Sequence, residues 1–117
     1  MSIPLNIAFR DFEPTESVRS AVVDHVEKLE SYVDRISSCR VTLSAPHRHQ
    51  HKGRIYHVSI QLHLPGKDIV VDREAEKNSD HEDIYVAIRD AFRAVERKLE
   101  EHMRKRRDAS KVNRRAI

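Results

Sequence analysis

The chain has 117 residues, which is enough for one hydrophobic core but not for two. Its 2 glycines and single cysteine exclude glycine-rich phosphate loops, disulfides within the chain and cysteine metal cages. Residues 89–117 hold 11 Lys and Arg against 5 Asp and Glu, a net charge of +6, which leaves −3 for residues 1–88. Positive charge concentrated at one end of the chain is typical of a protein that binds a polyanion.

The sequence also predicts where the protein resides and what it does not do. Acidic residues are spread through the first thirty positions, and no apolar run approaches the length of a membrane span. We therefore expect no signal peptide and no membrane association, and the lone Cys39 fits a reducing cytoplasm. No Ser, His or Asp spacing matches a nucleophile elbow, so we expect no enzyme, no cofactor and no small-molecule substrate.

Hydrophobic periodicity predicts six elements in the order β-α-β-β-β-α. Alternating apolar and polar residues indicate strands, and apolar residues three and four positions apart indicate helices. The expected strands cover residues 3–9, 39–45, 58–64 and 69–72. The expected helices cover residues 15–35 and 79–107, and Ser79 with Glu82 forms a capping-box pair at the start of the second. Pro4 indicates that the first strand lies at a sheet edge.

Each expected helix has one apolar stripe and each expected strand has one apolar face. The simplest arrangement is an α+β fold, a four-stranded sheet with the two helices packed on one face. The first helix would connect two parallel strands by a right-handed crossover, and the last three strands would form an antiparallel meander. Residues 1–108 are predicted to form a single domain. Residues 109–117 have no pattern and are predicted to form a flexible basic tail.

The polar face of the last helix is the main candidate binding surface. Its Lys and Arg residues recur about one turn apart, a spacing that suits successive phosphates. Acidic residues are interleaved with them, so a solvated surface with i to i+4 ion pairs is the alternative. The helix start is acidic at residues 80–83, and aromatic residues make up only 5% of the chain. We therefore expect RNA to run along the side and C-terminal half of the helix, with contacts mainly to backbone and shape. The candidate residues are Arg89, Arg93, Arg97, Arg104, Lys105, Arg106 and Arg107.

A second group of candidate functional residues consists of histidines. His47, His49 and His51 alternate in a polar connection, and in an extended hairpin they would point the same way, as three metal ligands do. No Cys or carboxylate within four residues completes a metal shell. A solvated or RNA-contacting loop is therefore favoured over a metal site, and no metal is predicted.

The sequence HEDIYVAI at residues 81–88, followed by VERKL at residues 95–99, resembles the ribosome hibernation family. Its members are called hibernation-promoting factors, ribosome-associated translation inhibitors or sigma-factor modulation proteins. The resemblance covers nearly the whole chain, including PLNIAFRDFEPT at residues 4–15 and the basic end. It implies the fold described above. It also implies a protein that occupies the decoding channel of the small ribosomal subunit and excludes mRNA and tRNA during stress or stationary phase.

The resemblance also implies specific contacts. Arg19, Lys28 and Arg97 stand at basic positions that match the family and would contact small-subunit rRNA, whereas Arg89 stands where the family often has Asp or Asn. The expected partners are the small subunit and the intact ribosome. The chain ends at Ile117, so we expect it to lack the C-terminal dimerisation domain of the long hibernation factors. The alternative is a protein-interaction module that regulates a transcription factor.

Overall fold

The computed structural model describes residues 3–11, 13–44, 48–49, 53–54, 56–74 and 84–115. The strands are β1 (Leu5–Arg10), β2 (Ser38–Ser44), β3 (Arg48–His49), β4 (Gly53–Arg54), β5 (His57–Leu64) and β6 (Lys67–Glu74). The helices are α1 (Glu16–Glu27), the 3₁₀ helix η1 (Lys28–Arg35) and α2 (Ile84–Arg115). The predicted β-α-β-β-β-α order is confirmed, with a short β3–β4 hairpin added where the sequence predicted a polar connection.

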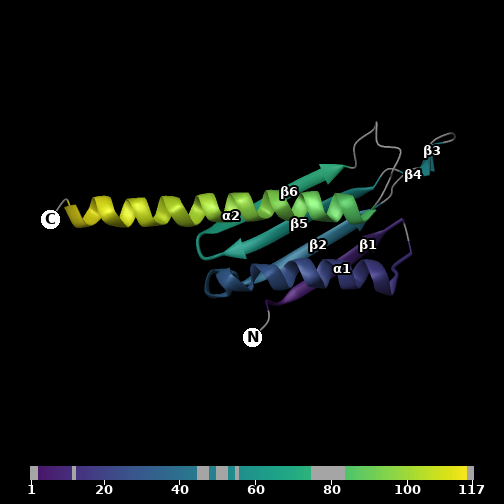
Figure 1. Cartoon of the computed structure of the whole chain (residues 1–117), viewed down its shortest axis with the longest axis horizontal. Coiled ribbons are helices and arrows are strands. Elements are labelled where there is room, and N and C mark those ends of the chain that lie inside the picture. The colour runs from purple at the N-terminus through teal and green to yellow at the C-terminus, as the bar shows by residue number, and fades with distance from the viewer. Residues whose placement is uncertain are drawn as a thin grey trace.

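The main sheet has the strand order β1-β2-β5-β6, so β1 lies at an edge as Pro4 indicated. β1 pairs with β2 in parallel, and β2, β5 and β6 form the expected antiparallel meander. One row across the sheet consists of Ile7, Val41, Ile60 and Val71, all facing the helices. α1 and α2 lie side by side on this face, as predicted, and leave the other face of the sheet open (Figure 1).

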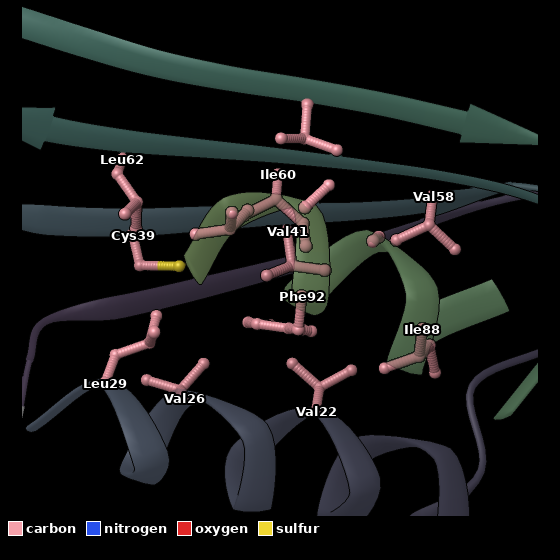
Figure 2. Packing of buried hydrophobic residues seen from close by; sticks show 14 of the residues in the cluster. Val22, Val26, Leu29, Cys39, Val41, Val58, Ile60, Leu62, Ile88 and Phe92 are labelled. Carbon is pink, nitrogen blue, oxygen red and sulfur yellow. The ribbon is translucent and has the colours of Figure 1, made fainter. Parts of the chain in front are cut away.

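The core lies where α1, α2 and the sheet meet. Phe92 of α2 is 2% exposed and sits between Val22 and Val26 of α1 and the strand residues Val41 and Ile60 (Figure 2). Cys39 points its Sγ into the same core and is 1% exposed. Among the described residues no polar or charged side chain is buried. The residues that would carry binding chemistry therefore lie on the surface.

The first helix departs from its predicted regular form. Thr15 caps α1 by accepting a hydrogen bond from the Val18 backbone N–H (3.2 Å), as expected for a Thr at this position. After Glu27 the chain continues as η1, with a kink at Tyr32 (φ −110°, ψ 15°), so the prediction of one regular helix over residues 15–35 is wrong. The three-residue period of a 3₁₀ helix keeps Leu29 and Tyr32 on one side, against the core.

The last helix is longer than the sequence pattern indicated. α2 has 32 residues and is about 48 Å long at 1.5 Å per residue. The backbone remains helical through residues 109–115, so the predicted helix end at residue 107 is wrong and this segment continues the helix instead of forming a separate tail. Basic residues complement the negative end of the helix dipole, which favours this extension. The predicted capping box at Ser79 and Glu82 lies outside the described residues.

The C-terminal end of α2 projects beyond the sheet and η1 (Figure 1). This projection accounts for the elongated shape, with extents of 64 × 30 × 18 Å. None of the helices in the described part of the chain is sufficiently long and apolar to cross a membrane.

Candidate nucleic-acid interface

The outer face of α2 is a row of exposed cations. Ile88, Val95 and Leu99 of α2 are fully buried against the sheet, which turns Arg93 and Arg97 outward on the opposite side. Arg93 and Arg97 are one helical turn apart, so their Cβ atoms are separated by about 5–6 Å. This spacing allows two guanidinium groups to contact neighbouring phosphates at the same time.

Acidic side chains lie among the cations of this face, but few of them form close ion pairs in the described part of the chain. Across the described residues, no carboxylate forms an ion pair with Arg93, Arg97 or Arg104, although Glu96 and Glu100 lie on the same helix. The ion pair that α2 does form joins Arg89 to Asp90, whose Oδ1 accepts from both Nε and Nη2 of Arg89 at 3.3 Å. The i to i+4 ion pairs of the alternative reading are not formed with Arg93, Arg97 or Arg104 among the described residues. Arg89 is the predicted contact on α2 that has an acidic partner.

Arg73 of β6 extends the cationic row. Together with Arg93 and Arg97 it lines a groove of about 510 Å³ on the outer side of α2, which three carboxylates also line, those of Asp90, Glu96 and Glu100. Arg73 was not among the predicted contacts, because the apolar pattern predicted that this strand ends at Asp72. The available signal was the alternation itself, since Arg73 is two positions beyond the buried Val71 and continues its helix-facing side.

A further cation stabilises the exposed edge of the sheet. Lys98 donates from Nζ to the backbone carbonyl of Val70, at 3.3 Å, on the outer side of β6. An edge strand presents unpaired carbonyls, and a lysine that covers one of them discourages pairing with another chain. Lys98, Lys67 and Lys105 line a small groove of about 210 Å³ beside β6.

The basic cluster at residues 104–107 is exposed on all sides of the projecting helix. Successive residues of an α-helix are 100° apart, so the four side chains leave the axis in different directions. Lys105 lies on the β6 side, whereas Arg104, Arg106 and Arg107 line a groove shared with η1. The cluster is therefore two surfaces rather than one.

Two further predicted contacts, Arg19 and Lys28, belong to the α1–η1 segment. Arg19 places its Cζ 5.4 Å from the centre of the Phe9 ring, on the β1 side. His25 stacks on Phe92 of α2, with ring centres 5.1 Å apart and planes at 11°. Burial lowers the pKa of His25, and the charge of Lys28, three residues further along the chain, lowers it further. Arg19 therefore lies on the β1 side of α1, whereas His25 contacts α2.

The histidine site finds no support among the described residues. His47 and His51 lie outside them, and only the backbone of His49, in β3, is described. Within the described ranges no group of three His, Cys, Asp or Glu side chains is placed to hold a metal. His57 and His63 on β5 instead contact the carboxylates of Asp72 and Asp68 on the neighbouring strand through a ring nitrogen.

Comparison with known proteins identifies the family. Residues 5–107 match the profile described as Sigma 54 modulation protein / S30EA ribosomal protein. The chain belongs to this family. The match covers the main sheet, α1, and α2 as far as Arg107, so it includes the cationic face of α2.

Two curated relatives of this S30EA protein illustrate the range of the family. The ribosome hibernation promoting factor of Pseudomonas putida is 28% identical over 101 residues, which cover 86% of this chain and 87% of that protein. The ribosome hibernation promotion factor of Deinococcus radiodurans is 36% identical over 90 residues, which cover 77% of this chain but 44% of that protein. The match therefore takes in less than half of the longer relative.

Solved structures agree with the S30EA fold. The N-terminal domain of Protein Y from Thermus thermophilus superposes with a TM-score of 0.66 at 27% identity, covering 87% of this chain and 99% of that one. A ribosomal subunit interface protein from Coxiella burnetii gives a TM-score of 0.71 at 14% identity, covering 86% and 98%. At that low identity the second comparison establishes the fold alone.

Proposed function

We propose that this protein is a ribosome hibernation factor of the cytoplasm, which binds rRNA of the small ribosomal subunit in the decoding channel. By occupying the channel it blocks mRNA and tRNA during stress or stationary phase. The observation that carries the proposal is the row of exposed arginines along α2, Arg93, Arg97 and Arg104, which form no ion pair with any described residue. Family membership and the names of the curated relatives support the ribosome as the partner.

The shape of α2 suits an occupant of a narrow channel. A single α-helix with its side chains is about 10–12 Å in diameter, much narrower than a whole domain. The C-terminal end of α2 projects free of the sheet (Figure 1), so it can enter a groove that excludes the rest of the molecule. Binding of this kind blocks a channel by occupancy and needs no catalytic group, which agrees with the expectation that the protein is not an enzyme.

Sedimentation through sucrose gradients tests the proposal. We expect the protein to migrate with the small subunit or the intact ribosome at low salt and to leave it at high salt, because phosphate contacts release counterions and weaken as salt rises. Addition of the purified protein to a cell-free translation reaction should reduce protein synthesis. A protein that stays at the top of the gradient at every salt concentration would contradict the proposal.

The competing function is regulation of a transcription factor, which the family description also contains. In that case the basic face would meet an acidic protein surface. Affinity capture after nuclease treatment separates the two functions. Loss of the captured partners on nuclease treatment supports rRNA as the ligand, whereas a retained protein partner without ribosomal proteins would favour the transcriptional role.

A further inference from the structure

A groove lies between η1 and the C-terminal half of α2, at the place where the chain departs from the predicted regular helix. Its volume is about 750 Å³. The kink at Tyr32 turns this residue toward α2, where its hydroxyl donates a hydrogen bond to Glu100 Oε2 at 3.3 Å. The groove is lined by Ser31, Tyr32, Glu100, Met103, Arg104 and Arg107. Departures from locally preferred structure are expected at functional sites, so this groove is a candidate binding site.

At the end of the groove next to Tyr32, the carboxylate of Glu100 is a hydrogen-bond acceptor. Glu100 accepts from Tyr32 through one oxygen, and the described residues supply no second donor to this carboxylate. Burial and the charge of Glu100 both raise the pKa of Tyr32, so the phenol keeps its proton and remains a donor at neutral pH. The hydrogen bond therefore holds the carboxylate in place while leaving most of its acceptor capacity unused.

The outer end of the groove is cationic. Arg104 and Arg107 follow Glu100 at one and two helical turns, and neither forms an ion pair within the described part of the chain. Side chains on an α-helix lean toward its N-terminus, so both guanidinium groups are directed back over the groove. Seven residues of helix separate Glu100 from Arg107 by about 10 Å, which is close to the length of one nucleotide from base edge to phosphate.

We propose that this groove binds one unpaired guanine nucleotide. Glu100 accepts hydrogen bonds from N1–H and the N2 amino group of the base, while Arg104 and Arg107 bind the phosphate. An ionised carboxylate only accepts, so it selects the base edge with two adjacent donors, which guanine presents and adenine, cytosine and uracil do not. The ring of Tyr32 and the half-buried Met103 supply the apolar surface between the two ends.

The nucleotide has two chemical sources, an unpaired guanosine in an RNA strand or a free guanine nucleotide. The RNA source rests on the proposed function, whereas the groove chemistry is the same for both. Glu101 provides a matched control, because it is the next residue along α2 but lines the groove beside β6. Glu101→Gln therefore makes the same change of charge outside the proposed site.

The first experiment titrates guanosine 5′-monophosphate and adenosine 5′-monophosphate into the full chain, and follows the backbone amide of Tyr32 by NMR. We expect guanosine monophosphate to bind about 5- to 150-fold more tightly than adenosine monophosphate, the discrimination that a bidentate base contact provides. Glu100→Gln should remove the preference and Glu101→Gln should retain it. Equal binding of the two nucleotides by the unaltered protein, or an unchanged preference in Glu100→Gln, would overturn the proposal.

The second experiment identifies the source of the nucleotide. Kethoxal modifies N1 and N2 of unpaired guanine, the two groups assigned to Glu100. It is applied to small subunits that sedimentation shows to be saturated with each protein. A guanine protected by the unaltered protein and by Glu101→Gln, but reactive with Glu100→Gln, supports rRNA as the source. Guanosine monophosphate binding without such a guanine supports a free nucleotide. Because the titration contains no ribosomes, failure of the proposed function is distinguished from failure of the groove proposal.

Discussion

Replacement of Arg93 and Arg97 by Gln tests the binding face of α2 most directly. Both side chains are exposed, and neither forms an ion pair with a described residue, so their loss breaks no contact that stabilises the fold. Gln and Arg have similar helix propensities, so the free energy of unfolding should change by less than about 0.5 kcal/mol. Any loss of ribosome binding is then a loss of contact with the ribosome.

The expected loss of ribosome affinity in this double variant follows from counterion release. Each phosphate contact contributes about 0.7–0.9 to the slope of log affinity against log salt, so Arg93→Gln with Arg97→Gln should make the slope shallower by about 1.4–1.8. At about 0.1 M salt this corresponds to a loss of affinity of about 25- to 60-fold. The assay is binding of the labelled protein to purified small subunits across a series of salt concentrations.

The matched control removes the same charge from the open face of the sheet. Arg10 and Arg40 are exposed there, and replacing both by Gln also lowers the net charge from +3 to +1. We expect this control to alter the salt slope far less than the α2 variant does. Equal effects of the two double variants would refute the reasoning, because they would show that net charge and not the α2 face governs binding.

Three further predictions concern the core. Phe92→Ala should lower the free energy of unfolding by about 3–5 kcal/mol in chemical denaturation, since it empties the centre of the α1–α2–sheet contact; a loss below about 1 kcal/mol would contradict this packing. Burial lowers the pKa of His25 from 6.5, so the unfolded state binds more protons than the folded state and the free energy of unfolding should fall as the pH drops below about 6.5. In His25→Gln the denaturation midpoint should fall less over this pH range, and an unchanged pH dependence would contradict a role for His25. Burial raises the pKa of Cys39 to about 12, so iodoacetamide should modify it far faster in denaturant than in the folded protein, and equal rates would contradict its burial.

Much of this fold follows from periodicity. Alternation of apolar residues indicated each main strand, and the three-and-four spacing indicated both helices, because one buried face is required of every element in a two-layer domain. The predictions that were wrong concern single segments and not the arrangement of the elements. The turn from α1 into η1 at Lys28 was missed because α-helical and 3₁₀ periods place Leu29 and Tyr32 on the same side. The extension of α2 to Arg115 was missed because a helix without a core to pack against shows no apolar pattern.

For the candidate site, too, the sequence predicted one part and the tertiary structure was needed for the rest. The sequence by itself determined that α2 has a cationic outer face, since burial of Val95 and Leu99 leaves Arg93 and Arg97 no other direction. Tertiary structure decided which of the cations act together, because that depends on neighbours distant in the sequence. It adds Arg73 from β6 to the face, separates Arg19 on the far flank of α1, and brings Tyr32 to Glu100 across 68 positions of the chain. A side chain's direction follows from its own helix or strand, but its partners follow only from how those elements pack.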